Sequence, residues 1–167
     1  MWEKIRTELG GHPERLKVAR LCLETGLAIR GEGIYLDKIE IPTARIGKAA
    51  DVDRRTVVET ARMISNSPSL RPIFEGLQPA GLSLRGVSKQ LGLGVVEITA
   101  EDPRTIGILS SSSKLLADAG ISIRQALVDD PELVPEPKLT LIGDKSIPGA
   151  IIPEMLKIRG IAKISIY

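Results

Sequence analysis

The residues with the clearest chemical potential lie in one short turn, residues 102–107, which reads Asp-Pro-Arg-Thr-Ile-Gly. The turn follows an apolar run and precedes a helical pattern, so it joins a strand end to a helix N-terminus. Unpaired backbone N–H groups at such an N-terminus attract anions such as carboxylates. Gly107 would let a ligand approach the backbone closely; a helix-start glycine without any ligand is the alternative. The turn therefore predicts a site for a ligand group that carries a negative charge, such as a carboxylate.

Three elements must position this turn. Residues 95–99 are a short apolar run typical of a strand, and the residues after Gly107 repeat with helical spacing. Gly120 stands where a left-handed glycine commonly ends a helix, and residues 121–128 predict a second strand. Strand, helix and strand in this order indicate a crossover packed on one face of a sheet. The inner face of the helix is expected to hold Ile108, Ser112, Leu115 and Ala119, with Leu109 and Leu116 beside them.

Further periodic segments complete the chain. A strand at 138–142, a helix at 148–158 and a strand at 163–167 extend the second half to a βαββαβ order. The first half is mainly helical, with a small hairpin around Gly31 and Gly33. The expected fold class is α+β, in which a winged-helix-like N-terminal domain precedes the βαββαβ domain. The expected boundaries are 1–78 for the first domain, 79–93 for a linker helix and 94–167 for the second domain.

A helix-turn-helix pattern occupies residues 43–65. The first helix is expected at 43–50, the turn at Asp51-Val52, and the second helix at 54–65 with Asp53 as its cap. In DNA-binding modules of this kind the second helix enters the major groove. An ordinary helical hairpin with a solvated basic face is the alternative, because acidic residues partly offset the arginines. The candidate contacts to double-stranded DNA are Lys48, Arg54, Arg55 and Arg62.

Composition narrows the function classes. Residues 1–92 hold 15 Lys and Arg against 11 Asp and Glu, and residues 93–167 hold 8 against 10, so only the first half is basic. Aromatic residues make up 2% of the chain, which argues against a stacking platform for single-stranded nucleic acid. Cys22 is the single cysteine and lies in an apolar helical run, so we expect a buried thiol and no disulfide or zinc cluster.

Catalysis and membrane insertion find little support in the sequence. His12 is the only histidine and precedes a helix start, which disfavours a Ser/His/Asp triad and a histidine-based metal site. We therefore expect no enzyme, no cofactor and no metal. No apolar run approaches the roughly 20 residues that span a bilayer, and no signal peptide is recognisable. A cytoplasmic protein without membrane partners is the expectation.

The second half resembles a known regulatory module. Its βαββαβ order, an acidic residue after strand one, a glycine opening helix one and Ala-Gly-Ile-Ser-Ile opening strand two resemble the ACT domain, a ferredoxin-like module that commonly binds amino acids. The whole chain is similar to archaeal predicted regulators of amino-acid metabolism with a C-terminal ACT domain. The supporting stretches begin at Ala50, Leu91, Gly120 and Asp129 and read Ala-Asp-Val-Asp-Arg-Arg-Thr-Val, Leu-Gly-Leu-Gly-Val-Val-Glu-Ile, Gly-Ile-Ser-Ile-Arg-Gln-Ala and Asp-Asp-Pro-Glu-Leu-Val-Pro-Glu-Pro-Lys-Leu-Thr.

The resemblance implies an effector held by the loop after strand one and by strand two of a partner domain. An amino acid held there would place its carboxylate on the helix N–H groups and its ammonium near Asp102. This chain departs from the family in a longer loop and in Ser122, which stands in place of the usual asparagine. The implied function is a ligand-sensing regulator that binds a small effector such as an amino acid and is coupled to DNA binding. We also expect a homodimer through the second domain, because a small sheet with exposed edges buries little surface by itself. The alternative is a regulatory or interaction subunit of a biosynthetic enzyme without DNA contact. The implied ligand-binding residues are Asp102, Thr105, Ile106, Gly107, Ile108, Ser122 and Ile123.

Overall fold

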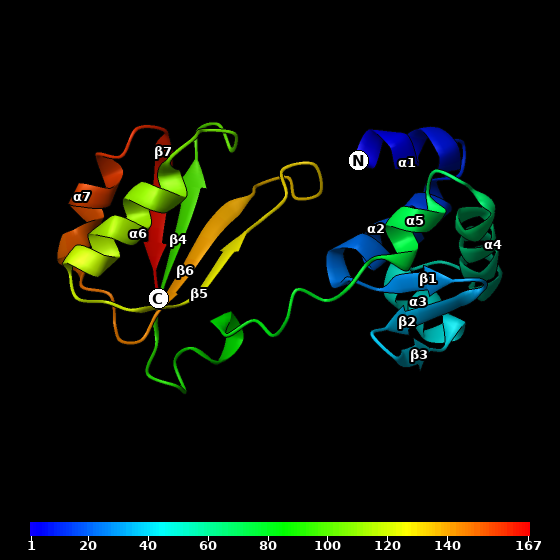
Figure 1. Cartoon of the computed structure of the whole chain (residues 1–167), viewed down its shortest axis with the longest axis horizontal. Coiled ribbons are helices and arrows are strands. Elements are labelled where there is room, and N and C mark those ends of the chain that lie inside the picture. Colours follow the sequence, from blue (N-terminus) through cyan, green and yellow to red (C-terminus); the bar gives the residue numbers. More distant parts are fainter. The chain divides into compact units, whose positions relative to one another are not determined.

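The computed structural model describes residues 1–167 and divides them into two compact units, Met1–Leu82 and Ser83–Tyr167 (Figure 1). Helices and antiparallel sheets occur in both, so the predicted α+β class is confirmed. Each unit has its own hydrophobic core, built mainly from Ile, Leu, Val and Ala. No helix in the structure has the length and apolar character needed to cross a bilayer.

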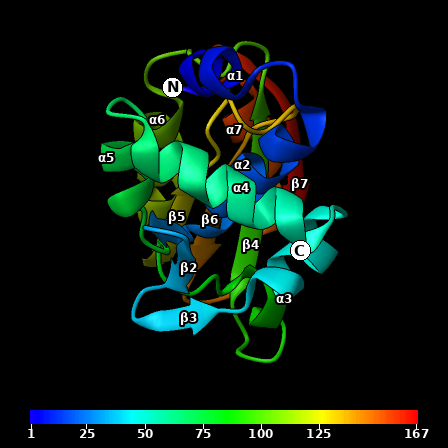
Figure 2. The ribbon, with the colours of Figure 1, turned by 90° about the vertical axis from the view of Figure 1, so that its right-hand side faces the viewer.

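The first unit packs helices and a small sheet around one core. The three strands pair in the order β1-β2-β3, all antiparallel, and the sheet precedes the helical pair α3 and α4 in the chain. Helix α4 crosses the front of this unit in Figure 2. The elements are α1 (Trp2–Leu9), α2 (Pro13–Thr25), β1 (Ala28–Arg30), β2 (Gly33–Leu36), β3 (Ile39–Ile41), α3 (Thr43–Ala50), α4 (Arg54–Asn66) and α5 (Arg71–Glu75).

Helix α1 is attached to the unit by apolar and aromatic contacts. Ile5 and Leu9, one turn apart on the same face, are buried in the core. Trp2 packs against this core and lies under the guanidinium of Arg20, whose Cζ is 4.8 Å from the ring centroid. Such a cation–π contact adds about 0.5–1 kcal/mol where it is exposed.

The two helices predicted over residues 43–65 are present as α3 and α4, and α4 ends one residue later than expected, at Asn66. The carboxylate of Asp53 caps α4 by accepting a hydrogen bond from Arg55 N at 2.7 Å. Gly47 is buried where the two helices meet, and a Cβ there would lie 2.9 Å from the carbonyl oxygen of Val52. Glycine thus permits the close approach of the turn to α3, a feature that hydrophobic periodicity does not reveal.

The second unit has the predicted βαββαβ order. Its strands pair in the order β5-β6-β4-β7, all antiparallel, and α6 and α7 cover one face of the sheet (Figure 1). The central strand β4 sends Val96 and Ile98 into the core below the helices. The elements are β4 (Gly94–Ala100), α6 (Ile108–Asp118), β5 (Ile123–Val128), β6 (Lys138–Gly143), α7 (Ile152–Leu156) and β7 (Ile161–Ile166).

Two expectations about helices in this part of the chain were wrong. The linker helix over 79–93 is absent, and the segment contains only a 3-10 turn at Arg85–Val87. Glycines and local serine bonds explain this, since Ser83 Oγ accepts from Arg85 N and Ser88 Oγ donates to Arg85 O. On α6 the structure buries Ile108, Ser112 and Leu116, whereas Leu115 is only half-buried. Ala119 is exposed and lies beyond the last helical residue, Asp118, so it was wrongly expected on the inner face.

Candidate functional site

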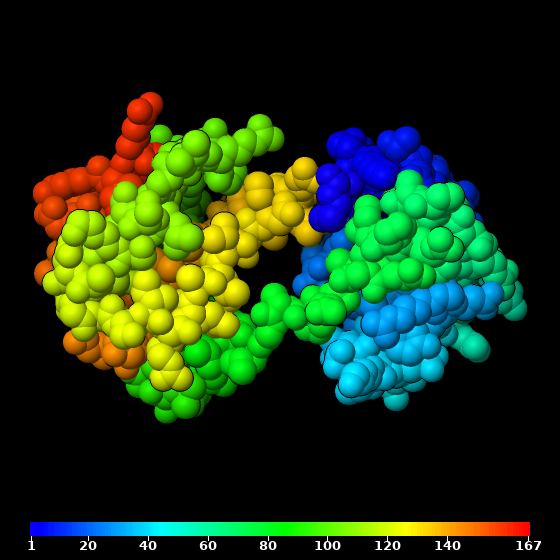
Figure 3. Space-filling model, in the orientation of Figure 1, coloured from blue at the N-terminus to red at the C-terminus, as the bar shows by residue number.

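A cavity of about 150 Å³ opens between the start of α6 and the sheet of the second unit. Figure 3 shows this hollow between the light-green start of α6 and the yellow end of β5. Its walls are mainly aliphatic, and its charged members are Asp129 and Lys138. The lining residues are Ile98, Ala100, Pro103, Thr105, Gly107, Ile108, Leu109, Val128, Asp129, Pro137, Lys138 and Leu139.

Three of the seven predicted ligand residues line this cavity, namely Thr105, Gly107 and Ile108. Two others lie beside it. Asp102 turns back to accept a hydrogen bond from Arg104 N at 2.9 Å, and Ile106 is 99% exposed. Both border a separate shallow depression near Gly160.

The remaining two predicted residues, Ser122 and Ile123, lie at the other end of β5. That strand is six residues long, so roughly 17 Å separates them from the cavity end of the same strand. Ser122 is tied locally to Asp144, whose Oδ1 accepts from Ser122 N at 3.1 Å. Within one chain, therefore, Ser122 and Ile123 do not contribute to the cavity that Gly107 lines.

The start of α6 borders the cavity, since Gly107, Ile108 and Leu109 line it. Gly107 has a φ of 96° and ends the turn in the left-handed region that favours glycine. The first intrahelical hydrogen bond runs from Ser111 N to Gly107 O. The N–H groups of Ile108, Leu109 and Ser110 come before it and therefore have no acceptor within the helix. These groups carry the positive end of the helix dipole, which favours a negatively charged ligand group.

The charged residues at the cavity come from the base of the β5–β6 loop, which the sequence prediction missed. Asp129 Oδ2 accepts a hydrogen bond from Lys138 N at 3.1 Å, and Asp129 N donates to Lys138 O at 3.0 Å. Pairing of β5 with β6 brings these two residues together. A signal for Asp129 existed in the sequence, because it directly follows the apolar run of the second strand.

The four predicted DNA-binding residues are exposed, and three of them, Arg54, Arg55 and Arg62, border one shallow depression on α4. Arg54 and Arg55 begin α4, Arg62 lies two turns further on, and Lys48 is exposed on α3. Arg62 Nε donates to Glu32 Oε1 at 2.8 Å, and this hydrogen bond raises the pKa of the Arg62 guanidinium.

Neighbouring acidic and polar groups reduce the number of cations that are free to contact a phosphate on this surface. Glu59, on the same helix, is paired with Arg15 at 3.2 Å, and Arg54 Nε donates to Thr43 Oγ1 at 3.3 Å. Arg55 and Lys48 have no ion pair within the structure. The exposed cations that remain available to a phosphate are therefore mainly Lys48, Arg54 and Arg55.

Cys22 is fully buried in the core of the first unit, and burial raises the pKa of its thiol to about 12. His12 precedes α2 as its exposed N-terminal flank and makes no side-chain cap bond. The structure groups no three His, Cys, Asp or Glu side chains in an arrangement suited to a metal ion. No protein-family model matches the chain, and no curated protein matches its sequence.

Proposed function

We propose that this protein is a ligand-sensing regulator whose second unit is a ferredoxin-like, ACT-type module that binds a small aliphatic amino acid. The observation that carries the proposal is the cavity at the start of α6, where aliphatic walls, helix N–H groups and one carboxylate meet. The strand order β5-β6-β4-β7 supports the ferredoxin-like assignment, because the first strand of the unit is central and its crossover helix lies on one face.

Each part of an amino acid has a counterpart in the cavity. An apolar cavity of about 150 Å³ accommodates a benzene-sized group, which matches the side chain of valine, leucine or isoleucine. The N–H groups at the start of α6 suit the carboxylate. Asp129 lines the cavity and suits the ammonium, so we assign it the role that the sequence had given to Asp102.

The first unit is proposed to be a winged-helix-like module in which α4 faces double-stranded DNA. The capped N-terminus of α4 and the exposed pair Arg54 and Arg55 support this role. Residues near the start of a recognition helix are those that reach phosphates and base edges.

A second candidate is a regulatory subunit of a biosynthetic enzyme that makes no DNA contact. The ion pairs Arg62–Glu32 and Arg15–Glu59 favour it, because they place acidic groups on and beside the surface that would meet phosphates. Co-purification of an enzyme from the native host, together with the absence of a gel shift, would support this candidate over the first.

Titration calorimetry with each of the twenty amino acids tests the proposed ligand class. We expect binding by valine, leucine or isoleucine, and a ligand at 100 times its dissociation constant should add about 2.7 kcal/mol to the free energy of unfolding. Val128→Asp places a second carboxylate at the cavity wall and should abolish binding. Leu156→Asp, at an exposed apolar residue outside the cavity, is the matched control and should bind normally. Failure of all aliphatic amino acids to bind would refute the proposal.

A further inference from the structure

The face of the second sheet opposite α6 and α7, here called the open face, contains a buried carboxylate. Side chains alternate along a strand, so Glu97 of β4 points away from the core that holds Val96 and Ile98. Glu97 is nevertheless only 3% exposed. A buried carboxylate in the centre of a sheet is costly unless cations and donors surround it.

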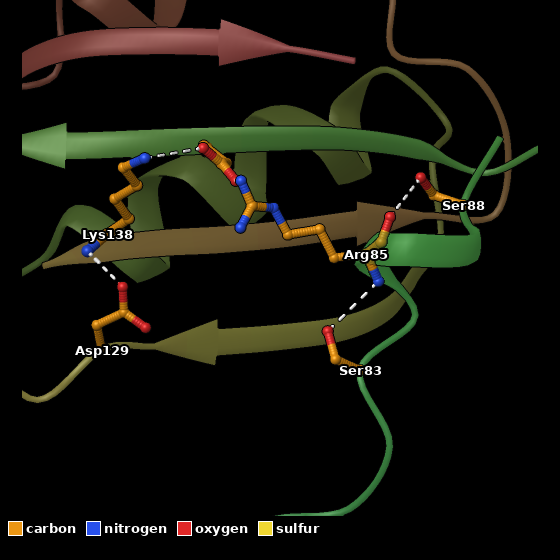
Figure 4. A network of polar contacts seen from close by, with 6 residues as sticks. Ser83, Arg85, Ser88, Asp129 and Lys138 are labelled. Atoms are coloured by element: carbon orange, nitrogen blue, oxygen red, sulfur yellow. Dashed lines mark hydrogen bonds and ion pairs between the residues drawn. The ribbon is translucent and has the colours of Figure 1, made fainter. Parts of the chain in front are cut away.

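Two cations from different segments meet this carboxylate (Figure 4). The guanidinium of Arg85 pairs with Glu97 Oε1, and Lys138 Nζ donates to Glu97 Oε2 at 3.3 Å. Arg85 comes from residues 83–93, here called the strap, which lead from the first unit into β4. Lys138 opens β6 and also lines the cavity.

Additional contacts hold the strap against the open face. Leu84 packs with the buried residues Leu93, Val95 and Ile142. Leu84 N donates to Gln125 Oε1 of β5 at 2.9 Å. The strap is therefore held by a small apolar cluster, a hydrogen bond to β5 and an ion pair. Of these contacts, the ion pair is the one linked to the cavity, because Glu97 also pairs with the cavity residue Lys138.

We propose that the strap reports the occupancy of the cavity through a charge relay of Asp129, Lys138, Glu97 and Arg85. The proposal rests on the ligand site proposed above and adds how that site communicates with the chain leading to the first unit. Asp129 accepts a hydrogen bond from the backbone N of Lys138, and Lys138 and Arg85 share the carboxylate of Glu97. Figure 4 shows Asp129, Lys138 and Arg85 side by side on this face of the sheet.

The direction of the effect follows from competition for two carboxylates. A ligand ammonium at Asp129 competes with Lys138 N for Asp129 Oδ2 and loosens the start of β6. Lys138 Nζ, at 3.3 Å, then withdraws from Glu97. Arg85 is then the only cation beside Glu97. A buried carboxylate interacts more strongly with one cation when no second cation competes for it. Occupancy of the cavity should therefore tighten the strap.

Amide hydrogen exchange of the strap measures this tightening in the full chain, because exchange reports the local opening equilibrium. Glu97→Gln removes the shared charge and should accelerate strap exchange about tenfold. Lys138→Gln and Asp129→Ala each imitate the occupied state and should slow strap exchange about fivefold, within the usual range of coupling between sites. Asp118→Asn breaks the exposed Lys114–Asp118 pair in the same unit and serves as the control that should leave the strap unchanged.

The three variants decide the relay without any ligand. If Glu97→Gln leaves the strap unchanged, the ion pair does not hold it; if Lys138→Gln and Asp129→Ala accelerate strap exchange or leave it unchanged, the coupling is overturned. L-isoleucine is the ligand probe, and it should slow strap exchange in the wild type and have no effect in Lys138→Gln. Absence of isoleucine binding in calorimetry would count against the proposed ligand class, whereas binding without any change in the strap would overturn the relay.

Discussion

The backbone of Gly107 links the turn after β4 to the donors of α6. Its φ of 96° is accessible to glycine and costly for other residues. The nearest atom to a Cβ built there, outside the adjoining residues, is Ser110 Oγ at 3.9 Å, so the surroundings leave space for a side chain. The positive φ of Gly107, and its position in the wall of the cavity, therefore favour glycine at this residue.

Gly107→Val should abolish amino-acid binding and lower the free energy of unfolding by about 1–2 kcal/mol, because a β-branched residue is strained in the left-handed region. Calorimetry with L-isoleucine and thermal unfolding provide the two measurements. Gly149→Val is the control, since Gly149 has no neighbouring atom within 4 Å and no positive φ. Equal binding by wild type and Gly107→Val would place the site elsewhere.

Cys22 should be inert in the folded protein. Its thiol is buried and its pKa is raised to about 12 by desolvation, so almost no thiolate exists at neutral pH. A thiol reagent at pH 8 should label the native chain only as fast as the first unit unfolds, and should label the chain in guanidinium rapidly. Rapid labelling of the folded protein would contradict the buried position.

Helix α4 is the element through which DNA contact would occur. Arg54→Ala combined with Arg55→Ala should abolish a gel shift with double-stranded DNA and leave the melting temperature nearly unchanged, because both side chains are exposed. Binding by the wild type should weaken steeply as salt increases, since each phosphate contact releases counterions. Arg71→Ala, at an exposed arginine on α5, is the control. Absence of any shift by the wild type at about 50 mM salt, a range in which counterion release favours binding, would end the DNA assignment.

Elements with strong periodicity could be predicted from the sequence, and elements fixed by local polar bonds could not. Helix α3 has the expected bounds, and β4 and α6 match the expected runs to within one or two residues. The strap carries Leu84, Val87 and Leu91 at helical spacing, yet only Leu84 packs against a core. Glycines and serine bonds outweighed that spacing.

The candidate site shows the same division between local and long-range information. The start of α6 was identified because the helical spacing that begins at Ile108 is a local signal. Asp129 and Lys138 are nine residues apart and meet through strand pairing, which a single sequence does not specify. Glu97 occupies an alternating strand position that normally faces solvent, yet it is buried and contacts Arg85 of the strap and Lys138 of β6.

The whole molecule should be a dimer through its second unit. Strand β5 is an edge strand with exposed Arg124, Ala126 and Val128, and its outer backbone groups are available for pairing. A unit of this size also buries limited apolar surface by itself. Light scattering at tens of micromolar should therefore give twice the mass of 18.0 kDa. A proline at Ala126 should weaken the dimer while a monomer persists; a monomeric wild type would refute this prediction.

The stack of Trp2 under Arg20 gives the first unit an optical signal of its own. Trp2 is the only tryptophan in the chain, so tryptophan fluorescence reports the unfolding of α1 and of the core against which Trp2 packs. Far-ultraviolet circular dichroism senses the backbone of both units. Because the two cores are separate, denaturant midpoints from the two signals should differ, and an aliphatic ligand should shift the dichroism curve while the emission curve stays in place.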